Sequence, residues 1–283
     1  MSDSLPIELA PFTPASPPRL NGVVVMRDDH DALVDALLAD LFIHARNCVR
    51  AFGDFHFAVS GTPEAEPFLR RLMYDLNFRD FPWVRTRLWM VDEVALPAHD
   101  ERGRAAVVRG LVLEHSGIPR EQFHAIDALS PTASEEYQAD LRQHLGWREK
   151  GHDRLDFVLL SLTEDGVLGA RRPVASAGSG GHDGVGASGK SLLVESIPGT
   201  QPPLVALTVP FINASRVIAV IASGPAVRPS VARLVADTRG SGDRTAGAAE
   251  SQWPARALSP MAGELRWYLD KAACPEPPSA PPG

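Results

Sequence analysis

The chain has 283 residues, of which 44% are hydrophobic, and a formal net charge of −7, values typical of a globular protein with a large apolar core. Its acidity, with a pI of about 5.7, disfavours nucleic acid or an anionic membrane surface as a partner. No apolar run approaches the ~20 residues that a membrane-spanning helix requires. The two cysteines cannot build a disulfide framework, so the cytoplasm is the expected location.

Short apolar runs alternate with amphipathic segments along the chain. The runs rich in β-branched and aromatic residues predict strands at Gly22–Met26, Phe55–Val59, Arg85–Val91, Asp156–Leu160, Leu192–Glu195, Leu204–Thr208 and Val217–Ala222. Apolar residues at helical spacing predict helices at about Asp31–Ala51, from Pro63 through Leu72, and at Arg104–His115, Ser134–Leu145 and Arg228–Arg239. This alternation predicts an α/β fold, a doubly wound and mainly parallel sheet with helices on both faces.

Composition also indicates how the chain is divided. Residues 1–21 are rich in proline and lack apolar periodicity, which predicts a disordered leader without a secretory signal. A single α/β domain is expected over residues 22–273, with a flexible loop at 174–190 where Gly, Ser and Ala dominate. The proline-rich end, residues 274–283, is expected to be a disordered tail.

The stretch Leu155–Pro173, LDFVLLSLTEDGVLGARRP, is the expected centre of a site. A buried strand runs here into a turn that carries Asp165 and Gly166. In open parallel sheets, ligands bind beyond the carboxyl ends of the strands, where such turns lie. Asp92 and Glu93 follow another expected strand and are predicted to lie in a turn at the same edge.

Five stretches carry a family resemblance. They are FAVSGTPEAEPFLRRL at Phe57–Leu72, WMVDEVALP at Trp89–Pro97, LDFVLLSLTEDG at Leu155–Gly166, LVALTVPFINASRVIAVIASG at Leu204–Gly224 and GELRWYLDKAA at Gly263–Ala273. Together with the order of elements, they resemble the 6-phosphogluconolactonase family, which is related to the glucosamine-6-phosphate isomerases. The resemblance covers about Gly22 to Ala273 and implies a role in carbohydrate metabolism, through the pentose-phosphate route.

The resemblance also implies what the site should contain, and several of those groups are missing. The family's general base is the His of an Asp-Gly-His loop, and the matching residue here is Val167. The second glycine of the family's early turn matches Thr62, and the Arg of its Asp-Glu-Arg segment matches Val94. Two further cationic positions of the family match Leu204 and the neighbourhood of Val227.

Several family positions are retained, namely Gly61, Asp92, Glu93, Asp165, Gly166 and Asn213. Turn chemistry alone can explain glycine, aspartate and asparagine at such positions. We take Asp165, Asp92 and Glu93 as the candidate catalytic remnants. The candidate substrate-binding residues are Gly61, Thr62, Gly166, Arg171 and Arg172.

These losses predict a 6-phosphogluconolactonase-like protein that is catalytically impaired or inactive. Removing a general base typically costs ~10²–10⁴ in rate, and a valine cannot replace an imidazole. Such a protein could bind a sugar phosphate or a protein partner. The alternative is an active lactone hydrolase that converts 6-phosphogluconolactone to 6-phosphogluconate with a rearranged site. Its substitute cations and base would come from Arg102, Arg104, Arg171, Arg172, Arg228, His99 and His182.

The segment GVGASGKS at Gly184–Ser191 fits the phosphate-loop pattern at every fixed position. A glycine-serine tract precedes it instead of a strand, and Pro198 follows too soon for a long helix. Nucleotide binding is therefore a second alternative. No cofactor and no metal site are expected, because the histidines are scattered along the sequence. Trp267 and Tyr268 are expected to pack in the core.

Overall fold

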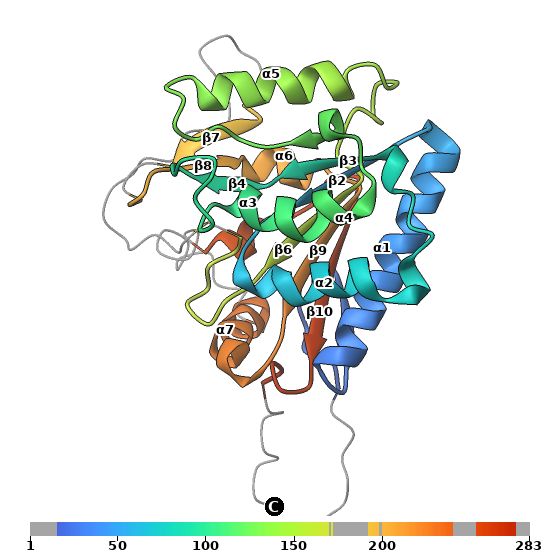
Figure 1. The fold of residues 1–283 in the computed structure, drawn as a ribbon. Helices are drawn as coiled ribbons and strands as arrows, with labels where there is room; N and C mark the ends of the chain where they lie inside the picture. Colours follow the sequence, from blue (N-terminus) through green and yellow to red (C-terminus); the bar gives the residue numbers. More distant parts are fainter. Residues whose placement is uncertain (1–15, 170, 172–191, 198–199, 240–252, 276–283) are drawn as a thin grey trace, which may run out of the picture.

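A computed structural model describes residues 16–169, 171, 192–197, 200–239 and 253–275 (Figure 1). The Gly184–Ser191 motif and Arg172 lie outside these residues, as does the expected loop at 174–190. None of the helices in the described part combines the length and the hydrophobicity of a membrane span.

The main sheet has seven parallel strands in the order β1-β10-β9-β6-β2-β3-β5. The strands are β1 (Val23–Arg27), β2 (Phe55–Val59), β3 (Thr86–Met90), β5 (Phe123–His124), β6 (Phe157–Ser161), β9 (Val217–Ala222) and β10 (Glu264–Asp270). Every residue of β2, β6 and β9 is buried, as expected for strands covered on both faces. The prediction of a mainly parallel sheet is confirmed.

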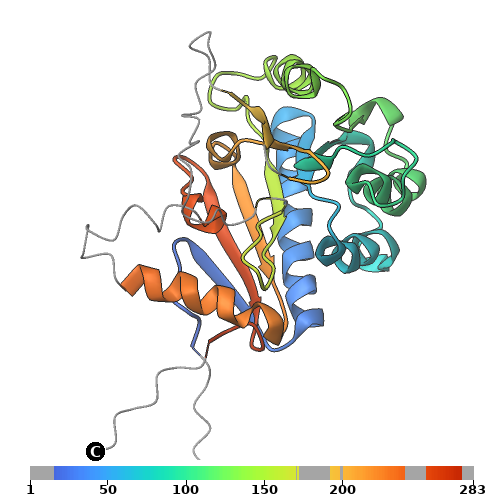
Figure 2. The ribbon, with the colours of Figure 1, turned by 90° about the vertical axis from the view of Figure 1, so that its left-hand side faces the viewer.

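Helices cover both faces of this sheet. Figure 2 shows α1 (His30–Phe52) and α2 (Glu66–Tyr74) on one face and α7 (Arg228–Arg239) on the other. Asp29 caps the start of α1, where its carboxylate accepts a hydrogen bond of 2.8 Å from the amide of Ala32. The doubly wound arrangement is therefore confirmed as well.

A second, antiparallel sheet was not predicted. It consists of β4 (Asp92–Val94), β8 (Leu204–Leu207) and β7 (Val194–Ile197), in the order β4-β8-β7. The helix α5 (Ala133–Leu145) lies beside β7 and β8 at the top of Figure 1.

The prediction that Asp92 and Glu93 lie in a turn is wrong. The amide of Val91 still donates to the carbonyl of Val59 in the main sheet, over 3.0 Å, while its carbonyl accepts from the amide of Leu207, over 2.8 Å. The chain therefore passes from one sheet directly into the other, and Asp92 and Glu93 pair with β8.

Other differences concern shorter segments. The expected helix at Arg104–His115 is divided into α3 (Arg104–Val108), a π-helical turn and α4 (Glu114–Ser116). A short helix, α6 (Val209–Asn213), follows β8, and the Thr208 hydroxyl caps it. Trp267 and Tyr268 are 2% and 0% exposed in β10, which confirms that they pack in the core.

Candidate functional site

Asp92, Ser60 and Arg104 meet at the carboxyl edge of the main sheet, just beyond β2 and β3. The Ser60 hydroxyl donates to Asp92 Oδ1 over 2.7 Å. Arg104 Nη1 forms an ion pair with the same oxygen and lies 3.3 Å from Ser60 Oγ. Asp92 is only 1% exposed. Burying a carboxylate without a partner is costly, so the contacts with Ser60 and Arg104 compensate for the burial of Asp92.

Gly61 brings the backbone of α3 close to β2. A Cβ at Gly61 would lie 2.1 Å from the carbonyl oxygen of Arg104, which no side chain tolerates. The lack of a side chain at Gly61 therefore permits a close approach of the two backbones, which places Arg104 beside Asp92.

Glu93 closes the start of α3. Its carboxylate accepts hydrogen bonds from the amides of Val94, Arg104 and Ala105, at 2.9, 2.8 and 2.6 Å. Burial raises the pKa of Glu93 above its ordinary value, although the three amides oppose that shift. The side chain thus caps the first turn of a helix, where a negative charge is favourable.

Asp165 and Gly166 form a tight turn after β6. Gly166 has a φ of +73°, and an added Cβ would lie 2.5 Å from the Trp253 ring. The turn is closed by Thr163, whose amide donates to the carbonyl of Val167 at 3.0 Å and whose hydroxyl accepts from the Val167 amide at 3.1 Å. Asp165 is exposed. The turn that the sequence predicted exists, with Val167 at its end.

The arginines considered as substitute phosphate ligands have protein partners. Arg171 Nη2 lies 2.6 Å from Glu195 Oε1 and also donates to the Leu207 carbonyl. Arg102 pairs with Asp100 at 2.7 Å. Arg228 Nε donates to a backbone carbonyl at 3.0 Å. Arg104 is paired with Asp92, so each of these four described arginines has a partner within the protein.

Two buried oxygens at this edge lack a hydrogen-bond partner among the described residues. They are Asp92 Oδ2 and Thr62 Oγ1. Gly169 lies over Asp92 Oδ2, since a Cβ there would be 3.0 Å from that oxygen. The cavity beside Asp92, lined also by Leu168 and Arg171, has a volume of about 10 Å³. That is close to the ~10–15 Å³ that a single water needs.

Asn213 has a structural role. Its amide nitrogen donates to the Ala257 carbonyl at 2.8 Å, and its side-chain oxygen accepts from the Ser259 amide at 2.9 Å. Both bonds connect α6 to the segment that leads into β10. Asn213 therefore braces the loop between these two segments.

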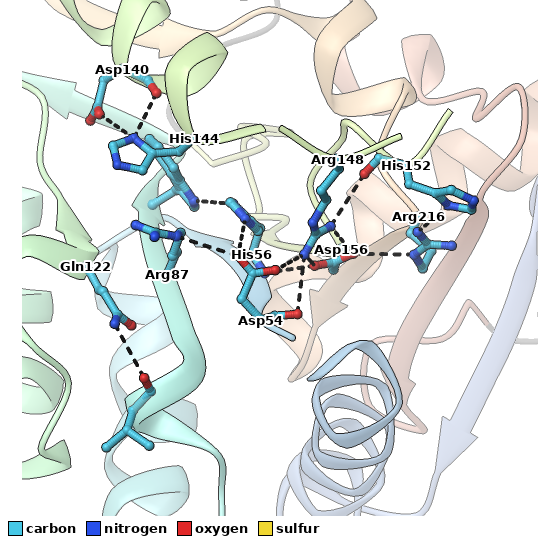
Figure 3. A network of polar contacts seen from close by, with 12 residues as sticks. Asp54, His56, Arg87, Gln122, Asp140, His144, Arg148, His152, Asp156 and Arg216 are labelled. Atoms are coloured by element: carbon cyan, nitrogen blue, oxygen red, sulfur yellow. Dashed lines mark hydrogen bonds and ion pairs between the residues drawn. The ribbon is translucent and has the colours of Figure 1, made fainter. Parts of the chain in front are cut away.

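A larger polar network lies at the opposite edge of the sheet, where β2 and β6 begin (Figure 3). Arg148 donates to both oxygens of Asp156, at 3.0 and 2.9 Å, and to Asp54 at 2.6 Å. Arg216 lies on the other side of Asp156, at 3.4 Å. The Arg148 and Asp156 side chains are 1% and 0% exposed.

His56 connects this network to the core aromatic residues. Its Nε2 pairs with Asp54 at 3.1 Å, and its Nδ1 accepts from Trp89 Nε1 at 3.1 Å. Burial lowers the pKa of His56. Although burial opposes it, hydrogen bonds from His56 and Arg148 hold the pKa of Asp54 below its ordinary value. Sequence reasoning missed this network, since only Asp156 beside an apolar run hinted at it.

Two of the histidines that are scattered along the sequence lie close together in the structure. The structure brings His124 and His144 together at Asp140, although 16 and 4 residues separate them from it in the sequence. His124 is also buried, at 6% exposure. The i, i+4 spacing of Asp140 and His144 was the only signal for this cluster in the sequence.

Comparison with known proteins relates the chain to one family. The family model for glucosamine-6-phosphate isomerases/6-phosphogluconolactonase matches residues 28–267. The GDH/6PGL endoplasmic bifunctional protein of Homo sapiens is 27% identical over 244 residues, 85% of this chain and 28% of that protein. A probable chloroplastic 6-phosphogluconolactonase 3 of Oryza sativa subsp. japonica is 27% identical over 231 residues, 78% of this chain and 65% of the relative.

The chain therefore spans less than a third of the human protein and just under two thirds of the rice protein. Among solved structures, 6-phosphogluconolactonase from Thermotoga maritima superposes with a TM-score of 0.66 at 19% identity. That comparison covers 88% of this chain and 99% of the bacterial one. At this identity the likeness concerns the fold.

Proposed function

The chain belongs to the glucosamine-6-phosphate isomerase/6-phosphogluconolactonase family, and on this premise we propose that it is a 6-phosphogluconolactonase-like protein that no longer hydrolyses the lactone. One observation carries the proposal. Val167 closes the Asp165-Gly166 turn at the position where the family resemblance places the histidine base. Lactone hydrolysis needs a group there that takes a proton from the attacking water, and an isopropyl side chain has no lone pair.

The nearby carboxylates do not replace this base readily. Asp92 shares one oxygen with Ser60 and Arg104, and Glu93 is held by three backbone amides. Asp165 is exposed to solvent on the turn, whereas Asp92 and Glu93 are buried. Asp92 and Glu93 therefore have roles in the fold that explain their presence without catalysis.

The cationic groups support the same proposal. Holding a phosphate ester takes charge-assisted hydrogen bonds from Arg or Lys. Arg104 and Arg171, which lie beside Asp92, are both committed to acidic partners. Diverting either arginine to a phosphate would leave a carboxylate uncompensated, and for the buried Asp92 that cost is large.

An active hydrolase with a rearranged site is the second candidate, and one observation favours it. Asp92 Oδ2 is buried and unpartnered among the described residues, so its lone pairs are free to accept a proton. The adjoining cavity is close to the size of one water. In this mechanism Asp92 would deprotonate the attacking water, while Arg104 would stabilise the developing charge.

The two candidates are separated by the hydrolysis of freshly prepared 6-phosphogluconolactone. Purified full-length protein is added, and the rate is compared with spontaneous hydrolysis, with the Thermotoga maritima enzyme as the positive control. The proposal predicts no excess rate. An excess rate that Asp92→Asn or Asp165→Asn abolishes would overturn it in favour of the rearranged site.

What the scaffold retains can be tested with 6-phosphogluconate as the probe. If the chain binds sugar phosphates, calorimetric titration with this probe gives a binding signal. If its function is instead to bind a protein partner, no binding of the probe is expected. The cytoplasmic location, the single unit over residues 22–273 and nucleotide binding through Gly184–Ser191 remain predictions from the sequence.

A further inference from the structure

Three possible metal ligands converge where β5 meets α5. His124 Nδ1 lies 2.7 Å from Asp140 Oδ2, and His144 Nδ1 lies 2.8 Å from Asp140 Oδ1. The potential ligand atoms of the three side chains all lie within 4.8 Å of one another. His124 belongs to the edge strand of the main sheet, whereas Asp140 and His144 lie one turn apart on the helix. We call these residues the His-Asp-His cluster.

The hydrogen bonds within the cluster leave one buried nitrogen unused. His124 is 6% exposed, and its Nε2 has no hydrogen-bond partner among the described residues. Leaving a polar atom buried without a partner is costly. A neutral imidazole carries a lone pair on one of its two nitrogens, and Nδ1, which faces Asp140, is the nitrogen of His124 that is placed to bind an ion in this cluster.

The surroundings hold the histidines in place and leave a path for an ion. The His124 ring stacks on Trp89, with ring centroids 3.7 Å apart and an interplanar angle of 8°. The side chains of Asp140 and His144 are 34% and 23% exposed. The cluster is thus rigid on its inner side and open to solvent on its outer side, so water can complete the coordination of an ion.

We propose that the His-Asp-His cluster binds one divalent transition-metal ion, for which Zn²⁺ is the best match. Two imidazole nitrogens and one carboxylate oxygen form a ligand set suited to Zn²⁺, whereas Mg²⁺ and Ca²⁺ prefer oxygen alone. Ligands at ~2.0–2.2 Å from a tetrahedral ion lie roughly 3.3–3.5 Å apart. The present contacts of 2.7 and 2.8 Å need to open by less than about 1 Å to admit it.

Local charge also permits a cation. Arg87 is the nearby positive side chain that acts on His124, and its Nε lies 3.6 Å from Asp54. Its charge is therefore partly offset, and Asp140 supplies a negative charge at the site itself.

Binding would connect a short edge strand to a helix. β5 has only two residues, and α5 also contacts it through the Tyr137 hydroxyl, which donates to the His124 carbonyl at 3.2 Å. The contact of His124 with Asp140 already joins these two elements, and a metal ion at the cluster would replace it with coordination bonds from both side chains. The inference concerns stability and does not depend on the proposed loss of lactonase activity.

The test uses full-length protein freed of metal by chelation and then dialysed. Zn²⁺ is titrated by calorimetry, and Co²⁺ by visible absorption, which reports tetrahedral coordination. The wild type is expected to bind one ion per chain and to melt at a higher temperature with Zn²⁺ present. His144→Ala and Asp140→Asn are each expected to weaken binding at least tenfold and to remove the shift in melting temperature.

His115→Ala is the matched control, because His115 is an exposed histidine on α4 outside the cluster. This variant should bind as the wild type does. Circular dichroism verifies that each variant is folded, and both cluster substitutions lie on partly exposed side chains. The proposal is overturned if the wild type gives neither heat nor a Co²⁺ band, or if His144→Ala and Asp140→Asn bind as tightly as the wild type.

Discussion

At Gly61 the fold accepts nothing larger than a hydrogen atom, since a Cβ would lie 2.1 Å from the Arg104 carbonyl. The obstacle is backbone, which cannot rotate away as a side chain could. We expect Gly61→Ala to lower the free energy of unfolding by ~1–3 kcal/mol, the range for overpacked sites. Urea denaturation measures this change.

Gly110 provides the control, because an added Cβ there would meet nothing within 4 Å. Gly110→Ala should leave stability unchanged or raise it by up to ~1 kcal/mol, owing to the better helix propensity of alanine. Equal losses in the two variants would contradict the packing account of Gly61.

Single residues also show where sequence reasoning succeeds. Gly166 has the turn role that its residue type suggested, because a tight turn depends on chemistry within a few residues. The contacts of Gly61 with Arg104 and of Asn213 with Ala257 and Ser259 join residues that are distant in the sequence. The ion pair of Arg104 with Asp92 could not be foreseen. It joins residues that two different elements carry to the same point, and no sequence spacing encodes that distance.

At the scale of elements, the buried pair Arg148–Asp156 supports the start of β6. Asp156 is 0% exposed, and it also accepts the His56 amide at 2.8 Å. Removing one partner of such a pair leaves the other charge buried in the core without compensation. We expect Asp156→Ala to cost ~3–5 kcal/mol of unfolding free energy, measured by denaturant titration.

The exposed pair Arg70–Glu66 serves for comparison, with side chains 55% and 39% exposed. An i, i+4 pair on a helix surface contributes only ~0.3–0.5 kcal/mol. Arg70→Ala should therefore have a small effect. If Asp156→Ala were equally mild, the network in Figure 3 would not contribute to stability as we infer.

The same network predicts a dependence of stability on pH. Burial lowers the pKa of His56 from 6.5, so His56 binds a proton more readily in the unfolded chain than in the folded one. The contribution of His56 to stability is therefore fully present above the pKa of the unfolded chain and is lost as the pH falls below 6.5. The pKa of Asp54, lowered from 3.8, adds a further loss below that value.

Thermal melts between about pH 7.5 and about pH 5 test this prediction. The melting temperature of the wild type should fall over this interval, and His56→Gln should reduce the fall, because one titrating group is removed. A melting temperature that rises on acidification, or an undiminished fall in the variant, would contradict the assignment.

The elements themselves follow closely from the sequence where they are regular. The strands that were predicted and the longer helices begin and end within a few residues of their predicted bounds, because apolar periodicity sets which faces are buried. β5 and the seven-residue β10, which lies inside the main sheet, were not predicted as strands. The second sheet did not follow. β4 is three residues long, too short for a periodic signal, and its pairing with β8 joins distant parts of the chain.

At the scale of the whole molecule, the chain has the fold of its family. The carboxyl edge carries ion pairs internal to the protein, Arg104 with Asp92 and Arg171 with Glu195. The order of elements made the fold predictable, because that order and the sheet topology constrain each other. Which arginines are free to bind a ligand depends on tertiary contacts and could not be predicted.

The rate of 6-phosphogluconolactone hydrolysis with purified wild-type protein shows directly whether the chain has lost lactonase activity. We expect the same rate with and without the protein, under conditions where the Thermotoga maritima enzyme is active. A rate clearly above the spontaneous one, abolished by Asp92→Asn, would contradict it and assign the missing base to Asp92.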